Sequence, residues 1–166
     1  IIHDTLPDLL PTGFKAYDDV AIGFDRREII TIGAGTGDGK SVVANQLAIN
    51  FVEKAKLDTL IVNFELPKKQ YYMRTLSNRS GVPFSKIRAA HTLTDEDRAK
   101  LVNARRDFEG NLHKNGTRFD IWYASDDTTL QNLVTKLTPQ KYRVVIIDYL
   151  GLIEVDGGKQ SRSQQE

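Results

Sequence analysis

Hydrophobic and polar residues follow two different patterns along this chain, and together they predict alternating strands and helices. Short, nearly continuous apolar runs have the length of strands; they occupy residues 28–32, 59–64, 119–123 and 143–148. The segments between them repeat apolar residues at the i, i+3, i+4, i+7 spacing of one helix face. We expect helices from Ser41 onward, at residues 68–79 and 85–90, after residue 94, and at residues 130–137.

Local signals refine the predicted boundaries. Thr94 and Asp97 have the spacing of a capping box, which predicts the start of a helix. Residues 110–116 are polar and are bounded by glycines, so we expect a loop there. Residues 7–13 contain two prolines and a glycine, which predicts an extended or turning lead-in.

Strands that alternate with helices imply an α/β fold. Right-handed crossovers then build a mainly parallel sheet with helices on both faces. The apolar run at residues 59–64 fits a strand that is covered on both faces. The 166 residues suffice for one ordinary domain with a hydrophobic core.

Composition excludes several classes of protein. The 23 lysines and arginines nearly balance 22 aspartates and glutamates, and a net charge of +1 does not indicate a nucleic-acid binder. The absence of cysteine excludes disulfides and thiolate metal sites. His3, His91 and His113 are too scattered to suggest a metal site. No segment approaches the ~20 apolar residues of a membrane span, so we expect a soluble protein.

The segment before the first long helix carries the strongest chemical signal. It matches the P-loop spacing G-x-x-x-x-G-K-[ST] except for alanine at the first position; its residues are Ala34, Gly35, Thr36, Gly37, Asp38, Gly39, Lys40 and Ser41. Glycines allow successive N–H groups to point at phosphate oxygens, and the helix N-terminus adds partial positive charge. Lys40 supplies an ammonium for the β- and γ-phosphates, and Ser41 supplies a hydroxyl for Mg²⁺.

Two other interpretations of this loop are weaker. An ordinary tight turn between a strand and a helix would not require lysine and serine directly after the last glycine. A dinucleotide-binding fingerprint that starts at Gly33 and Gly35 would need glycine or alanine where this chain has Asp38. The sequence therefore favours a nucleotide phosphate site.

Two acidic residues end predicted strands and complete the candidate site. Asp148 follows the apolar run VVII and has the form of a Walker B aspartate, which would hold a water ligand of Mg²⁺. Glu65 follows the second predicted strand, where it would orient or deprotonate an attacking water. The carboxyl ends of parallel strands meet at one sheet edge, so we expect both residues beside the P-loop.

The order of motifs along the chain resembles a known family. The motifs are LPTGFKAYDD at residues 10–19, the alanine-first P-loop, NFELP at 63–67, MRTLSNRSGVP at 73–83, IRAAHTLTDED at 87–97 and VVIIDYLGLIE at 144–154. This order resembles the C-terminal RecA-like ATPase domain of DnaB-type replicative helicases over nearly the whole chain. The order of the motifs carries the specificity, because a P-loop alone occurs in many NTPase families.

The resemblance implies a ring-forming motor that hydrolyses ATP, translocates on single-stranded DNA and separates a duplex. It assigns Lys40 to phosphate and catalysis, Ser41 and Asp148 to Mg²⁺, and Glu65 to the catalytic carboxylate. The implied partners are single-stranded DNA, the other subunits of a homo-hexamer, primase and a helicase loader. The implied location is the cytoplasm of a bacterium or of a phage-infected host cell.

The resemblance also suggests how the chain is divided. We expect a lead-in segment at residues 1–27, a RecA-like ATPase core at 28–155 and a loop at 156–166, where Lys159 and Arg162 are candidate DNA contacts or simply solvated charges. Gly151 departs from the glutamine that is frequent in the family. The family continues past residue 166 into a γ-phosphate sensor and a trans-acting arginine finger, so we expect little DNA-stimulated hydrolysis from these residues alone.

Two alternatives from other functional classes stay open. A recombinase or a regulatory clock-type ATPase has a similarly arranged P-loop and Walker B acid, but it remodels filaments or proteins. A nucleotide-binding fragment without turnover is the non-catalytic alternative. Unwinding of a forked duplex, together with DNA-stimulated hydrolysis, would distinguish the helicase from both.

Overall fold

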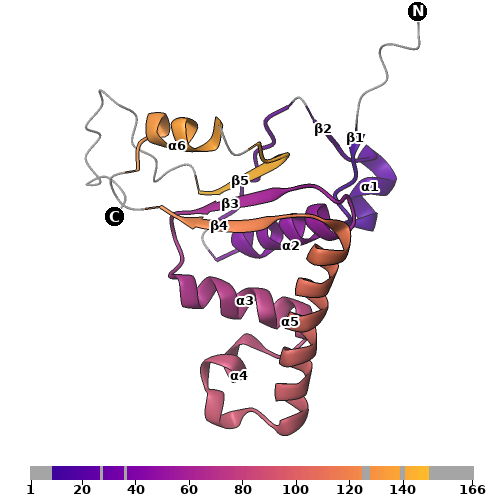
Figure 1. Ribbon diagram of the computed structural model, residues 1–166, viewed down its shortest axis with the longest axis vertical. Helices are drawn as coiled ribbons and strands as arrows, with labels where there is room; N and C mark the ends of the chain where they lie inside the picture. The colour runs from indigo at the N-terminus through magenta and orange to yellow at the C-terminus, as the bar shows by residue number, and fades with distance from the viewer. Residues whose placement is uncertain (1–8, 27, 36, 125–127, 139–140, 150–166) are drawn as a thin grey trace, which may run out of the picture.

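The computed structural model describes residues 9–26, 28–35, 37–124, 128–138 and 141–149, which form a parallel sheet with helices on both faces (Figure 1). The chain order of the elements is β1 (Leu9–Leu10), α1 (Lys15–Ala21), β2 (Phe24–Asp25), α2 (Lys40–Glu53), β3 (Thr59–Asn63), α3 (Lys68–Ser80), α4 (Phe84–Arg88), a 3₁₀ helix η1 (Ala90–Thr92), α5 (Asp95–Asn115), β4 (Phe119–Tyr123), α6 (Leu130–Leu137) and β5 (Val144–Asp148).

The sheet has the strand order β4-β3-β5, and both pairs are parallel. The central strand β3 is buried at every residue, as its continuous apolar run predicts for a strand covered on both faces. Its last residue, Asn63, lies opposite Tyr123 of β4 and Asp148 of β5. The predicted α/β class is confirmed, and the register brings the ends of all three strands to one edge.

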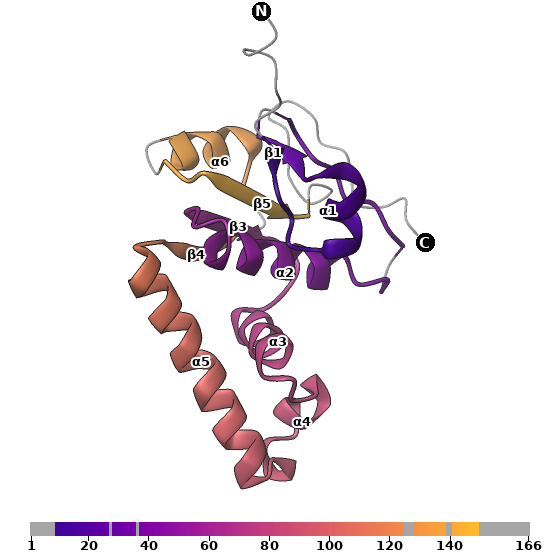
Figure 2. The ribbon, with the colours of Figure 1, turned by 90° about the vertical axis from the view of Figure 1, so that its right-hand side faces the viewer.

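Helices α2 and α6 cover opposite faces of the sheet (Figure 2). Ala48 of α2 packs against Ile61 of β3 in one core cluster, whereas Leu133 of α6 packs against Leu60 and Val62 in another. Successive side chains of a strand point to opposite faces, so these contacts follow directly from the alternation along β3. The apolar face predicted for the first long helix is confirmed, because Ala44, Leu47, Ala48 and Phe51 are all buried.

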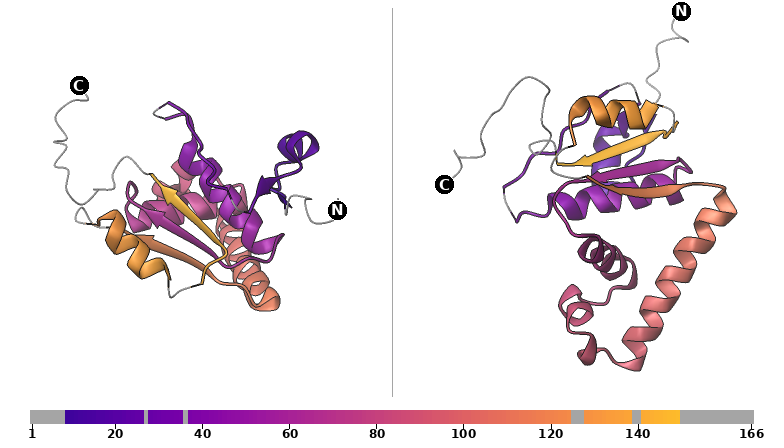
Figure 3. Two further views of the ribbon diagram at one scale, coloured as in Figure 1. Left: turned by 90° about the horizontal axis from the view of Figure 1, so that it is seen from above. Right: turned by 60° about the vertical axis from the view of Figure 1, so that its left-hand side comes forward.

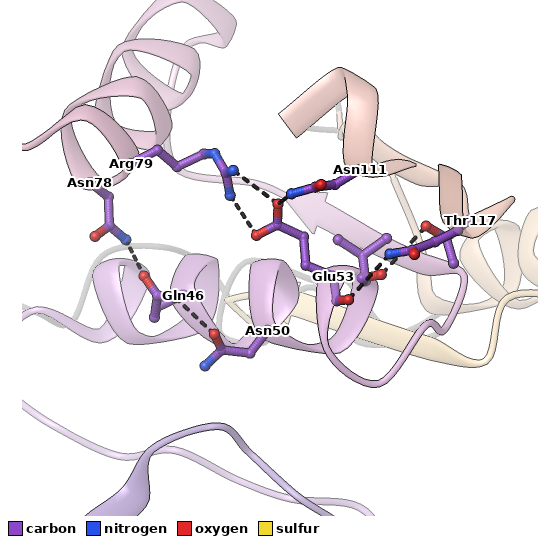
Figure 4. Close-up of polar contacts among 9 residues, drawn as sticks. Gln46, Asn50, Glu53, Asn78, Arg79, Asn111 and Thr117 are labelled. Atoms are coloured by element: carbon purple, nitrogen blue, oxygen red, sulfur yellow. Dashed lines mark hydrogen bonds and ion pairs between the residues drawn. The ribbon is translucent and has the colours of Figure 1, made fainter. Parts of the chain in front are cut away.

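The connection from β3 to β4 extends away from the sheet as a helical arm, which we define as α3, α4, η1 and α5 (residues 68–115). In Figure 3 this arm projects well beyond the sheet, and α5 returns alongside α3 to β4. Glu53 at the end of α2 joins the arm to the core (Figure 4). Its carboxylate accepts two hydrogen bonds from Arg79 of α3, at 2.7 and 2.9 Å, and one from Asn111 of α5 at 2.8 Å.

The prediction of a strand at residues 28–32 is wrong. The segment forms no strand in the described part of the chain, and Ile29 is 91% exposed. A strand requires a neighbour that pairs with its N–H and C=O groups. Among the described strands, β5 pairs only with β3, and none of them pairs with residues 28–32.

The prediction of a loop at residues 110–116 is also wrong, because α5 continues through Asn115. Gly110 lowers helix propensity, but tertiary contacts outweigh that effect. Asn111 and Asn115 donate to the Glu53 side chain and backbone, respectively. The helix ends at Gly116, whose φ of 63° suits a left-handed C-cap. At the other end of α5, the predicted capping box between Thr94 and Asp97 is confirmed.

The segment that precedes the P-loop is more regular than the predicted lead-in. β1 and β2 pair in antiparallel fashion around α1. The Asp18 carboxylate accepts hydrogen bonds from the backbone N–H groups of Thr12 and Gly13, which fixes the turn into α1. Leu10 packs in one core cluster with Phe51 of α2. In the described part of the chain, no helix combines the length and apolar character that a membrane span requires.

Candidate functional site

The predicted P-loop leads directly into α2, and its glycines adopt backbone shapes that other residues resist. Gly37 and Gly39 have φ values of 88° and 91°, in the left-handed region, and Gly39 is the N-cap of α2. A Cβ on Gly35 would lie 2.6 Å from a carboxylate oxygen of Asp38. Thr36 lies outside the described residues. The backbone conformation therefore favours glycine at positions 37 and 39, whereas at Gly35 the flexible Asp38 side chain could move aside.

Lys40 is the first residue of α2, and its side chain folds back over the loop. The Nζ atom donates to the carbonyl oxygens of Ala34 at 2.6 Å and Gly35 at 2.8 Å. The ammonium is thus held within the loop, at the positive end of the helix dipole. A phosphate oxygen would compete with these two carbonyls for the same donor. The position fits a cation that binds anions at a helix N-terminus.

Asp148 ends β5 as a buried acid with an unsatisfied oxygen. The residue is only 5% exposed, and its Oδ2 has no hydrogen-bond partner among the described residues. A buried carboxylate oxygen without a donor is unfavourable, and a nearby cation would compensate for it. This observation agrees with the Walker B role predicted for Asp148.

The donor set fits Mg²⁺ better than a metal held by protein ligands alone. The described residues contain no group of three His, Cys, Asp or Glu side chains that could enclose a metal ion. Mg²⁺ usually binds through one or two protein oxygens together with phosphate oxygens and water. Asp148 and the Ser41 hydroxyl are the protein oxygens that would take part in that mode of binding.

A small cavity lies between the start of α2 and the segment that follows β3. Its lining residues are Ser41, Val42, Asn45, Leu66, Tyr71, Arg74 and Asn78. The Tyr71 hydroxyl donates to Asn45 Oδ1 at 3.0 Å, which ties α3 to α2. Burial and, secondarily, the negative charge of Asp148 raise the pKa of Tyr71 above its ordinary value. Ile146 of β5 packs against the cluster formed by Ala48 of α2 and Tyr71 of α3, so these three elements meet in one region.

Glu65 lies at the same sheet edge, but in a more open setting. It is exposed and lines a groove with Lys68, Tyr123 and other residues of the strand ends. The structure thus brings Lys40 and Ser41 together on α2 and puts Glu65 and Asp148 at the ends of adjacent strands. The catalytic role of Glu65 stays a prediction. Gly151, Lys159 and Arg162 lie outside the described residues.

Sequence reasoning missed three polar residues in this region: Asn45, Asn63 and Tyr71. Each is nearly fully buried. Asn63 had a detectable signal, because it is an amide at the end of an otherwise apolar strand and asparagine is unfavourable in strands. Asn45 and Tyr71 had none, because their hydrogen bond joins residues 26 positions apart.

Comparisons with known proteins agree with this geometry. The family model described as the DnaB-like helicase C terminal domain matches residues 10–166. Replicative DNA helicase DnaC of Bacillus subtilis is 28% identical over 168 residues, which cover 99% of this chain and 36% of that protein. Replicative DNA helicase DnaB of Geobacillus stearothermophilus is 28% identical and covers 95% of this chain and 34% of that protein. The chain thus spans about a third of the length of these curated relatives.

Two solved structures are similar in fold. One, described as an ATPase domain, has a TM-score of 0.77 and 25% identity, and the match covers 97% of this chain and 57% of that one. A DnaB-like replicative helicase, solved in a study of its interactions with primase, has the same TM-score and identity and covers 97% and 39%. The predicted resemblance and the predicted RecA-like fold are confirmed. Because the family model matches nearly its whole length, the chain belongs to the family of DnaB-like helicase C-terminal domains.

Proposed function

We propose that this chain is the motor domain of an ATP-dependent replicative DNA helicase. The observation that carries the proposal is the pairing of a glycine loop, with Lys40 folded over it, and a buried Asp148 oxygen that lacks a donor among the described residues. Family membership implies nucleotide binding, and these features indicate ATP with Mg²⁺ as the form that is bound. Hydrolysis would then drive movement along single-stranded DNA.

Each proposed step uses a group of this chain. The backbone N–H groups of the loop and the start of α2 bind phosphate oxygens, and the Lys40 ammonium stabilises charge on the transferred phosphoryl group. Ser41 and Asp148 would hold Mg²⁺, which when bound neutralises charge on the phosphates. Glu65 orients or deprotonates the water that attacks the terminal phosphate.

One relative supports primase as a proposed partner. One similar solved structure is that of a DnaB-like replicative helicase and its interactions with primase. We infer that the complete protein forms a homo-hexameric ring on single-stranded DNA and works with primase and a helicase loader. This assignment places it in the cytoplasm of a bacterium or a phage-infected host.

Nucleotide affinity of a Lys40→Ala variant tests the proposal. Removal of the ammonium should greatly weaken ATP–Mg²⁺ binding, as measured by calorimetry, while the fold stays intact by circular dichroism. Lys54→Ala is a matched control, because Lys54 follows the other end of α2. Equal affinity of the two variants for ATP–Mg²⁺ would refute the phosphate site. Nucleotide binding without any hydrolysis by the complete protein would instead favour the non-catalytic alternative.

A further inference from the structure

Leu66, the residue that follows Glu65, is held by Asn63, which lies two positions before Glu65. The Asn63 side chain donates from Nδ2 to the Leu66 carbonyl at 2.5 Å, and its Oδ1 accepts from the Leu66 N–H at 3.1 Å. Both hydrogen-bonding functions of one amide therefore close the same turn. Glu65 lies between these two residues in the sequence, so its backbone is part of that turn.

The backbone on the other side of Glu65 is fixed as well. The N–H of Phe64 donates to the Asp148 carbonyl at 2.8 Å, and the N–H of Ala124 donates to the Asn63 carbonyl at 3.0 Å. The residues before and after Glu65 are thus tied, directly or through Asn63, to the ends of β4 and β5. These bonds set the position of the Glu65 backbone relative to the Asp148 backbone.

The identity of residue 63 has no explanation in packing alone. Asn63 is 2% exposed in the central strand, where the four preceding residues are threonine, leucine, isoleucine and valine. Burial of an amide in such a place is unfavourable unless its polar atoms are bonded. An apolar residue would suit the strand but would leave the Leu66 N–H and carbonyl without these partners.

We propose that Asn63 is a positioning residue for the catalytic carboxylate Glu65, and that it sets the place of Glu65 relative to Asp148. This inference rests on the proposed function, because it requires Glu65 to act on the attacking water. An exposed side chain on an unsupported turn samples many positions, whereas general base catalysis requires a defined one. The Asn63 amide supplies this order through its two hydrogen bonds to Leu66.

The test compares Asn63→Ala with Asn50→Ala in the full-length protein that contains this chain. Asn50 is a matched control, because it is 3% exposed and its side chain donates to the Thr12 carbonyl and accepts from Gln46, in a contact between α2 and the N-terminal segment. Asn63→Ala should lower kcat by about 10- to 100-fold, the range expected for a misplaced catalytic group, with the Kd for ATP–Mg²⁺ changed less than about twofold because Asn63 lies outside the P-loop. Asn50→Ala should retain kcat.

Two further measurements separate positioning from general destabilisation. Hydrogen exchange without nucleotide should show faster exchange at residues 64–67 in Asn63→Ala but not in Asn50→Ala. Asn63→Ser keeps one acceptor for the Leu66 N–H and should recover part of kcat. Equal kcat in the two alanine variants, unchanged exchange at residues 64–67, or a rise in Kd that matches the loss of kcat would each overturn the inference.

A Glu65→Gln variant distinguishes failure of this inference from failure of the proposed function. Loss of hydrolysis in Glu65→Gln with normal turnover in Asn63→Ala would overturn the positioning role alone. Normal turnover in Glu65→Gln would overturn the catalytic assignment of Glu65, and with it the role of Asn63.

Discussion

At the scale of single residues, Asp148 shows how a proposed metal ligand conflicts with stability. One of its oxygens is buried without a hydrogen-bond donor in the described part of the chain. Such an arrangement is unfavourable in the absence of a cation, and it persists because the surrounding sheet holds it in place. The proposed Mg²⁺ site is therefore expected to be destabilising when no metal is present.

Replacement of this acid gives the first prediction. Asp148→Asn removes the buried charge, so it should raise the unfolding free energy without metal by about 1 kcal/mol or more. The same change should weaken Mg²⁺-dependent nucleotide binding. Chemical denaturation in the presence of a chelator measures the first effect, and calorimetry with and without Mg²⁺ measures the second. A variant that is less stable than the parent without metal would contradict the explanation.

The residues of the site differ in how far the sequence predicts them. Lys40, Ser41 and the glycines lie within eight consecutive positions, so the spacing alone identifies them. Asp148 and Glu65 were predicted because each ends an apolar run. Tyr71 and Asn45 are in contact only in the folded chain, so the pattern of neighbouring residues in the sequence could not predict their hydrogen bond.

At the scale of secondary structure elements, the start of α5 depends on one ionised side chain. Asp97 accepts from Lys86 at 2.9 Å and from the Thr94 N–H at 3.2 Å, while Thr94 accepts from the Asp97 N–H. The hydrogen bond from Lys86, followed by the one from Thr94, lowers the pKa of Asp97 to about 2. The carboxylate therefore stabilises the folded arm in its charged form.

The pH dependence of stability follows from the sign of this shift. A carboxyl group whose pKa is lower in the folded state contributes fully above its unfolded pKa of about 3.9, and the contribution is lost as the pH falls toward 2. Asp97→Asn should thus lower the Tm at pH 7, and the difference from the parent should shrink between pH 4 and pH 2. Asp95→Asn, in the same first turn, is the control. A difference that stays constant across this range would show that ionisation of Asp97 does not matter.

The attachment of the arm gives a second prediction at this scale. Arg79 binds Glu53 with two hydrogen bonds and lies 4.4 Å from the centre of the Phe108 ring, and the side chains of the ion pair are only 14% and 18% exposed. Arg79→Met should lower the unfolding free energy by about 2 kcal/mol or more. Denaturation of Arg79→Met, Glu53→Gln and the double variant measures the coupling between them.

The comparison of these two single variants with the double variant has a definite expected result. The loss of unfolding free energy in the double variant should be smaller than the sum of the losses in the two single variants. Each single variant leaves one member of the ion pair without its partner, whereas the double variant leaves neither. Lys100→Met, which removes an exposed pair with Glu96, should have little effect. Strict additivity at Arg79 and Glu53 would mean that their contact contributes nothing.

Elements were predictable where a local pattern determined them. The periodicity of residues 41–51 and the apolar runs of β3, β4 and β5 indicated the correct type and place. Residues 28–32 have an equally apolar pattern, but a strand also needs a partner, and a local pattern carries no information about partners. The end of α5 was missed for a related reason, since Asn111 and Asn115 gain their bonds from Glu53 on another helix.

At the scale of the whole molecule, the prediction concerns coupling of hydrolysis to DNA. The complete protein should release phosphate from ATP faster in the presence of single-stranded DNA and should unwind a forked duplex, because its family relatives are replicative helicases. Lys40→Ala should abolish both activities, whereas Lys54→Ala should retain them. A steady-state phosphate-release assay with and without DNA measures the effect. Turnover that is insensitive to DNA would favour a regulatory ATPase of the same fold.

The helical arm is long enough to act as a lever on the edge of the sheet. α3 begins three residues after Glu65, and the 21-residue α5 connects the tip of the arm back to β4. A helix of this length is about 30 Å long, so a tilt of about 10° at its base would displace the far end by about 5 Å. A tilt that began at the turn beside Glu65 would thus be amplified into a displacement of several Å at the tip of the arm.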